Sequence, residues 1–317
     1  ALTGSIAYDY LMSFPGHFKD HILEDKLESI SLSFLVNKMV KRRGGIGPNI
    51  GYTMAFLGGD PVLLSTVGQD FGEYRSWLEA QGVDTRGVKV IPEDFTASFF
   101  ATTDKDNCQI ASFYPGAMSH ASEVTLDSWT ADPLDLVVIS PTDPEAMNLY
   151  IDEAQRLGIP YVYDPSQQTV RLTGDELRRG VEGAYALFLN DYEFCLVEKH
   201  AELSLQDMKD RVEILVITKG EQGSLVISQD AEYEIPVVQP DAIIDPTGVG
   251  DAFRGGFLTG LHYDFDLKLC GEMGSLAAAY CLETDAPQSH SYTRSEYIQR
   301  FRKHFDDQGK LDKLLSR

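Results

Sequence analysis

Residues 245 to 256 hold the side chains best suited to chemistry. They read Asp-Pro-Thr-Gly-Val-Gly-Asp-Ala-Phe-Arg-Gly-Gly, so a glycine-rich turn between two acids runs into a helical pattern. At such a helix start the N–H groups of Gly248, Val249 and Gly250 point outward, where the helix dipole favours negative charge. Asp251, in the first turn, can take a proton from a hydroxyl while the amides stabilise charge on a transferring phosphoryl group. The pattern indicates phosphoryl transfer, although an ordinary capped helix start can have the same sequence.

Composition and charge narrow the class of protein. The 317 residues are 43% hydrophobic and 24% charged, which is typical of a globular chain with a large core. With 27 basic and 49 acidic residues the net charge is −22, which argues against nucleic-acid binding because that needs a basic surface. No apolar run approaches the ~18 residues of a membrane helix, and the chain opens on a strand pattern without a signal peptide. We therefore expect a cytoplasmic protein that binds neither nucleic acid nor membrane.

The cysteines, the histidines and one basic cluster carry less information. Neither the four cysteines nor the seven histidines show metal-binding spacing, which predicts buried, reduced thiols and no zinc site. The basic cluster Lys38, Lys41, Arg42 and Arg43 is predicted to be a solvated face, as charge runs usually are. An anionic ligand would therefore be held locally, by backbone amides and a divalent metal.

Short apolar strands alternate with helical stretches from about residue 132 onward. Continuous rather than alternating hydrophobicity predicts parallel strands covered on both faces, at residues 136–140, 161–164, 185–190 and 213–219. Helical patterns lie between them, at 144–157 and 204–212, and a helix rich in small residues follows at 249–261. This is a doubly wound α/β pattern, in which ligands bind beyond the carboxyl ends of the strands.

The first 120 residues break this rhythm. Asp9 follows the opening strand, and a Gly-Gly pair at 44–45 leads through Asn49 into a helix that ends near residue 57. Residues 97–103 and 109–114 are predicted to form an antiparallel pair. We expect one α/β domain over residues 1–317, with a small β-sheet lid formed by segments 10–43 and 95–118.

These motifs together resemble the ribokinase family of sugar and nucleoside kinases, also called the PfkB family. Residues 44–49, 57–59, 67–72 and 82–85 are similar to its N-terminal signature, 190–193 to its Asn-x-x-Glu motif and 245–251 to its C-terminal signature. The resemblance implies a three-layer, doubly wound and mainly parallel α/β fold with a small β lid. It also implies transfer of the γ-phosphoryl group of ATP to a hydroxymethyl group. Pro246 and Val249 depart from the usual residues, but the amides of the anion site are retained.

The resemblance assigns a role to each part of the donor side. Asp251 is the expected base, and Gly248, Val249 and Gly250 form the anion hole that also meets the nucleotide. Asn190 and Glu193 are expected to orient Mg²⁺, through water; alternatively they are a polar helix N-terminus. The expected nucleotide loop contains Thr218, Lys219, Gly220 and Gly223, for which the alternative is an ordinary hairpin turn. Asp245 and Thr247 are candidates for a monovalent-cation site, so the expected cofactors are ATP and Mg²⁺, with K⁺ as a candidate.

On the acceptor side, Asp9 would accept hydrogen bonds from two vicinal hydroxyls, or is a turn residue. Gly45 and Asn49 would hold the same sugar. The stretch 106–118, which includes Gln109 and Phe113, and the segment 33–45 are most similar to the adenosine kinase and nucleoside kinase branch. The aromatic side chains on the lid segments would supply a flat slot for a purine, or form the core of the lid. These are Phe14, Phe34 and Phe113.

Adenosine is therefore the expected acceptor, converted with ATP to AMP and ADP. Another nucleoside, ribose or another sugar is the alternative within the family. The alternative from another class is a nucleotide-binding sensor that has lost turnover. The expected partners are only these small molecules, and the sequence leaves the oligomeric state open.

Overall fold

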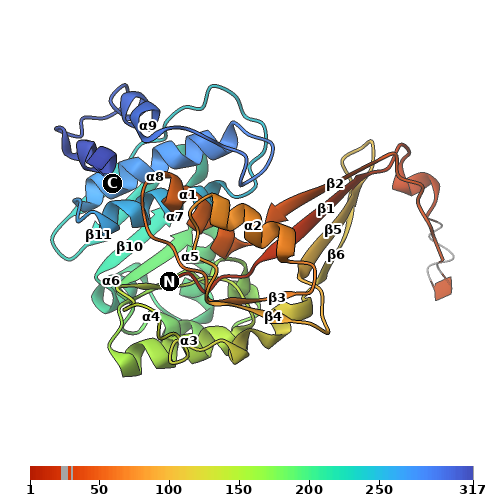
Figure 1. The fold of residues 1–317 in the computed structure, drawn as a ribbon, viewed down its shortest axis with the longest axis horizontal. Coiled ribbons are helices and arrows are strands. Elements are labelled where there is room, and N and C mark those ends of the chain that lie inside the picture. Colours follow the sequence, from red (N-terminus) through yellow and green to blue (C-terminus); the bar gives the residue numbers. More distant parts are fainter. Residues whose placement is uncertain (23–27, 30, 317) are drawn as a thin grey trace.

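The main domain is built on one mixed sheet. A computed structural model describes residues 1–22, 28–29 and 31–316. Its largest sheet has six strands in the order β12-β11-β10-β9-β8-β7, of which β7 to β10 are parallel and β11 and β12 antiparallel (Figure 1). The strands are β7 (Val137–Ile139), β8 (Tyr161–Tyr163), β9 (Ala186–Asn190), β10 (Ile214–Thr218), β11 (Ser224–Ser228) and β12 (Glu232–Ile235). The four predicted parallel strands are thus confirmed to within one residue at each end.

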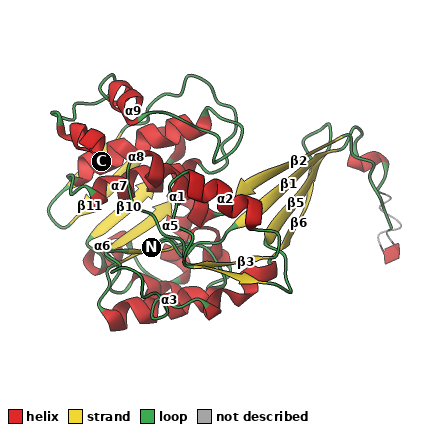
Figure 2. Cartoon of the chain, viewed as in Figure 1, coloured by secondary structure: helices red, strands yellow, loops and turns green. Residues whose placement is uncertain are grey.

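Helices cover both faces of this sheet, which gives three layers (Figure 2). Alternate strand residues enter two separate cores, for example Phe188 on one face and Leu187 and Leu189 on the other. The helices are α1 (Ile46–Phe56), α2 (Gly72–Ala80), α3 (Pro144–Leu157), α4 (Gly174–Val181), α5 (Asp191–His200), α6 (Leu205–Arg211), α7 (Val249–His262), α8 (Leu267–Leu282) and α9 (Arg294–Phe301). Glycines let α7 approach its neighbours, since a Cβ at Gly256 would lie 2.7 Å from a backbone oxygen of α8.

The N-terminal segment extends the main sheet before it enters the lid. Leu2 forms parallel bridges both to Val138, which is in β7, and to Leu63. The N-terminal segment therefore lies beside β7 and continues the main sheet past this edge strand. Strands β3 (Ser65–Gly68) and β4 (Val88–Ile91) form a further parallel pair. The chain start is therefore held in the main domain, and the next residues lead directly into the lid.

The lid is a four-stranded sheet that projects from the side of the main domain (Figure 1). Its order is β2 (Lys38–Gly44), β1 (Ala7–Ser13), β5 (Ala97–Thr103) and β6 (Gln109–Tyr114). The antiparallel pair β5–β6 has the predicted bounds, whereas Asp9 lies inside β1 and not after the first strand, so that expectation was wrong. Residues 23–27 and 30 of the predicted lid segment lie outside the described residues.

Two expectations about whole-chain properties can be compared with the structure. Among the described residues, no helix has the length and apolar character needed to cross a membrane. All four cysteines are free, but only Cys270 and Cys281 are buried. Cys108 and Cys195 are exposed, so the prediction that all four thiols are buried was wrong.

Candidate active site

One cleft of about 540 Å³ collects most of the predicted site residues. It lies where the carboxyl ends of the parallel strands, the start of α7 and the inner face of the lid meet. The predicted residues that line it are Asp9, Gly45, Asn49, Phe113, Asn190, Glu193, Thr218, Thr247, Gly248, Gly250 and Asp251. Those outside its lining are Gln109, Lys219, Gly220, Gly223, Asp245 and Val249.

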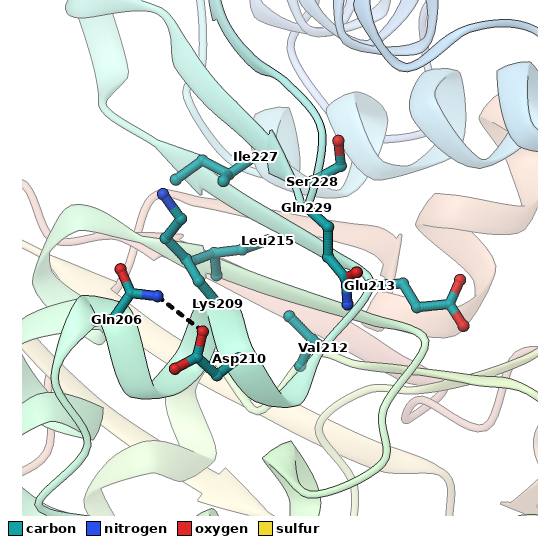
Figure 3. Close-up of a pocket in the computed structure, with 9 residues that line it drawn as sticks. All are labelled: Gln206, Lys209, Asp210, Val212, Glu213, Leu215, Ile227, Ser228 and Gln229. Carbon is teal, nitrogen blue, oxygen red and sulfur yellow. Dashed lines mark hydrogen bonds between the residues drawn. The ribbon is translucent and has the colours of Figure 1, made fainter.

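A second hollow, of about 490 Å³, contains none of the predicted residues (Figure 3). It lies between α6 and the amino end of β10, with Lys209 and Asp210 on one side and Glu213 and Gln229 on the other. In an open α/β sheet the ligand site is at the opposite, carboxyl end of the strands. The larger cleft is therefore the candidate active site.

The start of α7 has the backbone shape of an anion site. Gly248 caps the helix in the left-handed conformation, with φ of 77°, and a Cβ there would lie 2.5 Å from the Pro287 side chain. Only glycine fits both constraints. The N–H of Val249 makes a long hydrogen bond, 3.4 Å, to the Pro246 carbonyl, so this predicted donor is already engaged. Gly250 faces the cleft directly.

Asp251 lies at the third position of α7, with the character of a base. Burial raises the pKa of its carboxyl to about 7, assisted by two nearby acids and opposed by Arg254 and by a hydrogen bond from Asn49. The Asn49 Nδ2 donates that bond over 2.8 Å. A group with a pKa near the working pH is the most effective proton acceptor, because it is ionised and still basic.

A chain of hydrogen bonds behind Asn49 was not predicted. Gln288 is buried, and its Nε2 donates to Asn49 Oδ1 over 2.9 Å and to the hydroxyl of Tyr74. Tyr74 in turn donates to the carbonyl of Gly44 over 2.9 Å. Gln288 is 239 residues from Asn49 in the chain, so no local pattern pointed to it. Its contacts fix the amide that in turn holds Asp251.

One row of four side chains runs across the inner face of the lid, and all of them except Arg42 line the cleft. The strand register pairs Asp9 with Arg42 on one side and with Phe99 on the other, and pairs Phe99 with Phe113. Residues directly opposite one another share a face of the sheet, so a carboxylate, two rings and a guanidinium lie in line. Burial raises the pKa of Asp9, and Arg42 opposes this. Phe99 was missed, although the predicted β5–β6 hairpin could have identified it by register.

Three predicted side chains of the lid lie away from the cleft. Phe14 and Phe34 do not line the cleft; their rings pack with that of Phe18, at centroid distances of 5.0 Å between Phe14 and Phe34 and 4.9 Å between Phe18 and Phe34. They are lid core, the alternative considered for them. Gln109 is exposed farther out on the lid, where it donates to Thr103 over 3.3 Å.

The prediction that the basic cluster is a solvated face was wrong for Arg42. It donates from Nη1 to Asp245 Oδ2 over 2.6 Å, and the two side chains are only 19% and 22% exposed. Asp245 also accepts a hydrogen bond from the Thr247 N–H, at 2.9 Å. Burial would raise the pKa of Asp245, but the hydrogen bonds from Thr247 and Arg42 outweigh it and lower the value. A monovalent cation here would have to compete with Arg42.

The expected magnesium residues form a helix cap that also faces the cleft. Asn190 Oδ1 accepts from the Glu193 N–H at 2.7 Å, and Glu193 Oε2 accepts from the Asn190 N–H at 2.8 Å. Burial raises the pKa of Glu193, opposed by the Asn190 bond. The two residues thus form a capping box at the start of α5, which is the polar helix N-terminus named as the alternative, and both side chains also line the cleft. Because Mg²⁺ keeps much of its water, these residues fit an ion held through water.

The predicted nucleotide loop is a tight turn between β10 and β11. Thr218 pairs with Ser224 across it, and the Lys219 N–H donates to the Gly223 carbonyl over 2.8 Å. Thr218 reaches the cleft, whereas Lys219, Gly220 and Gly223 lie on the turn beyond it. The backbone of this segment therefore forms a hairpin turn, which was the alternative, and its role in nucleotide binding stays a prediction.

Sequence comparison identifies the family. Residues 17–294 match the pfkB family of carbohydrate kinases. The chain belongs to that family. As a pfkB family member it is a phosphotransferase that uses ATP and acts on an alcohol group of a nucleoside or sugar.

Two relatives, one of them solved in two states, illustrate the likeness. The ligand-free nucleoside kinase of Burkholderia thailandensis is 38% identical, with a TM-score of 0.86 over 95% of this chain and 99% of that one. The same enzyme in complex with inosine is 36% identical, with a TM-score of 0.86 over 96% and 98% of the two chains. A nucleoside kinase of Methanocaldococcus jannaschii is 29% identical over 95% of this chain and 96% of its own. These structures confirm the three-layer ribokinase-like fold and the resemblance to nucleoside kinases.

Proposed function

We propose that this protein is a purine nucleoside kinase that transfers the γ-phosphoryl group of ATP to a 5′-hydroxyl, with adenosine as its expected acceptor. The observation that carries the proposal is the position of Asp251. Its carboxylate lies at the amino end of α7, in the same cleft as Asp9 and the rings of Phe99 and Phe113. A base, an anion site and a sugar-binding carboxylate flanked by aromatic rings thus share one space.

Each group in the cleft has a task in this reaction. Asp9 accepts hydrogen bonds from the two vicinal ribose hydroxyls, and the rings of Phe99 and Phe113 lie against the flat base. The 5′-hydroxyl then points to Asp251, which takes its proton as the oxygen attacks the γ-phosphorus. The amide of Gly250 and the dipole of α7 stabilise the charge that develops on the phosphoryl oxygens.

A magnesium ion would neutralise part of the charge on the triphosphate. Asn190 and Glu193 are the residues that would hold it through water. Glu193 supports this role because its carboxylate is buried against the cleft, where a cation would favour the ionised form. The lid would exclude water above the acceptor, which limits hydrolysis of ATP.

The relatives favour a purine nucleoside over a free sugar. The Burkholderia kinase binds inosine and is matched over 96% of this chain. Inosine and adenosine share the ribose and the fused ring and differ at one ring substituent, so one aromatic slot accommodates either. Adenosine remains the expected acceptor, and inosine is the comparison that tests it.

The test is ATP consumption with adenosine, inosine, cytidine, ribose and fructose, with Asp251→Asn as the inactive control. We expect adenosine to have the highest kcat/KM and Asp251→Asn to lower kcat at least about 100-fold, the scale of a lost general base. Ribose outrunning every nucleoside would refute the nucleoside assignment. Binding of ATP without turnover of any acceptor would favour the sensor.

A sugar kinase is the second candidate, because Asp9 can bind the vicinal hydroxyls of free ribose equally well. The ribokinase of Haemophilus influenzae is 25% identical over 81% of this chain. Phe113→Ala separates the two, since this side chain is 49% exposed and its loss leaves the core intact. The variant should raise KM for nucleosides and leave KM for ribose unchanged; an equal KM for adenosine in both proteins would remove Phe113 from the site.

A further inference from the structure

Arg254 is a buried cation beside the proposed base. It lies on α7 three residues after Asp251, lines the cleft and is only 7% exposed. Long side chains on a helix point back toward its N-terminus, so the guanidinium extends toward the anion site. A Cβ at Gly250 would lie 2.9 Å from Arg254 Nη1, which places that nitrogen over the backbone of the glycine turn.

Within the described part of the protein, hydrogen bonds reach only one side of this guanidinium. Its Nη2 donates to Asp164 Oδ1 over 2.6 Å, and Asp164, which is fully buried, accepts from Ser140 Oγ at 3.1 Å with its other oxygen. The Nε is buried and has no hydrogen-bond partner among the described residues. A guanidinium carries five N–H donors, and leaving them unpaired away from water is unfavourable. The donors on Nη1, the nitrogen that lies over the glycine turn, are therefore the ones suited to a ligand in the cleft.

The acidic residues around Arg254 would repel an anionic ligand, and Arg254 is a cation that offsets them. Asp251, Asp164 and Glu193 all interact electrostatically with this one cation. A triphosphate entering the cleft would meet the carboxyl groups of Asp251 and Glu193, with that of Asp164 buried behind them, and Asp251 must stay ionised to act as a base. One guanidinium held by Asp164 offsets this repulsion where the helix start alone would not.

We propose that Arg254 is a further catalytic residue, which donates hydrogen bonds from its guanidinium to the phosphoryl group during transfer. The proposal rests on the proposed function only in that the reaction is phosphoryl transfer from ATP. In this step the bond between the γ-phosphorus and the β–γ bridging oxygen breaks, and its electron pair leaves with ADP. The acceptor oxygen forms the new bond to phosphorus and its proton passes to Asp251. Asp164 is the positioning residue that aims the guanidinium.

The decisive variant is the double replacement Arg254→Gln with Asp164→Asn. Replacing the arginine alone would leave the Asp164 carboxylate buried without its cation, which strongly destabilises a folded protein. The double variant keeps a neutral hydrogen-bonding pair, with an isosteric replacement at residue 164, while it removes both charges. The double replacement Arg302→Gln with Asp307→Asn is the matched control, because Arg302 holds a buried carboxylate too, that of Asp307, with 2.9 Å contacts from Nε and Nη2 outside the cleft.

The measurements are thermal melting, the Kd of ADP and of adenosine by calorimetry, and kcat at saturating substrates. We expect the folded double variant to bind both ligands within threefold of the wild type while kcat falls about 100-fold, the scale for one lost transition-state donor. Arg302→Gln with Asp307→Asn should lower the Tm and leave kcat unchanged. A folded double variant with kcat within threefold of the wild type would overturn the proposal. It would show that Arg254 and Asp164 form a purely structural ion pair.

A readout without an acceptor separates this proposal from the proposed function. The affinity for ADP with aluminium fluoride, which imitates the phosphoryl group in transfer, should fall at least tenfold in the Arg254 and Asp164 double variant and be unchanged in Arg302→Gln with Asp307→Asn. If the wild type phosphorylates no nucleoside, the proposed function fails, while this affinity still decides the role of Arg254. An unchanged affinity in the double variant contradicts that role whatever the acceptor is.

Discussion

Replacing the proposed base should make the protein more stable at neutral pH. Asp251 has an ordinary pKa of 3.8 that burial raises to about 7 in the folded protein. Because the folded state holds this proton more tightly than the unfolded state, the carboxyl group opposes folding increasingly as the pH rises from 3.8 to about 7. Above that range the opposing free energy is constant. Asp251→Asn removes the titrating group and keeps an oxygen that can accept from Asn49.

The size of the effect follows from the two pKa values. A difference of about 3 pKa units corresponds to about 4 kcal/mol at 1.36 kcal/mol per unit, which is an upper limit. Since water and Asn49 both reach the carboxylate, about half of this, ~2 kcal/mol, is a reasonable expectation. With an unfolding entropy of ~2.1 cal/mol/K per residue, that raises the Tm of a chain of this length by about 3 °C.

The assay is thermal unfolding of Asp251→Asn and the wild type at pH 5 and pH 8. At pH 8 the full difference should be present, whereas at pH 5 it should fall to less than half because the folded wild type is then largely protonated. Asp230→Asn, at an exposed turn, is the control and should show no pH-dependent difference. Equal Tm values for Asp251→Asn and the wild type at pH 8, or a difference independent of pH, would refute the reasoning.

Other consequences of the site geometry can be measured separately. The kcat/KM for the acceptor should rise with pH through an apparent pKa of about 7, tenfold per pH unit on the acid side, since only ionised Asp251 accepts a proton; a flat profile between pH 5 and 8 would exclude it as the base. Asp9→Ala should lower kcat/KM for the acceptor by about 100-fold, or ~3 kcal/mol, if both hydroxyl bonds are lost, with KM for ATP unchanged; an unchanged kcat/KM would remove Asp9 from the site. Gln288→Leu should lower kcat about tenfold and shift the pH profile upward, because Asn49 loses its support and with it the bond that lowers the pKa of Asp251; a lower Tm without any change in the pH profile would make Gln288 purely structural. Gly45→Ala should destabilise the protein by about 2 kcal/mol or more in thermal melting, since the residue has a φ of +94° and its Cβ would lie 2.4 Å from a backbone oxygen; a wild-type Tm would contradict that.

Elements with strong local signals were predictable from the sequence. The parallel strands are continuous apolar runs that end at turn residues, so their bounds were predicted to within one residue. The helix that starts at Val249 was predicted to end at 261 and ends at His262. Asp9 was misplaced because β1 is mixed in polarity and pairs with strands far along the chain, so that only the tertiary fold shows where it begins.

Residues that act across long sequence distances could not be predicted in this way. Gln288 reaches Asn49 through a loop that follows α8, and no motif connects the two. Arg42 belongs to a run of charges that sequence reasoning assigns to solvent, yet its strand register directs it inward beside Asp9. Its neighbours Lys41 and Arg43 point to the other face and lie over the rings of Tyr8 and Trp77. Successive side chains of a β-strand point to opposite faces, and this places Arg42 on a different face from its two neighbours in the cluster.

This separation explains how so acidic a chain can accept an anionic substrate. A net charge of −22 repels a triphosphate at long range, but salt screens such interactions beyond ~10 Å, so local groups decide binding. In the cleft the helix start of α7 and Arg254 oppose the carboxylates, while Arg42 neutralises Asp245 directly before the glycine turn. Arg42 belongs to the lid and Asp245 to the main domain, so their ion pair also joins the two halves of the site. If the lid moves, the charge felt by a phosphate at the start of α7 should change with it.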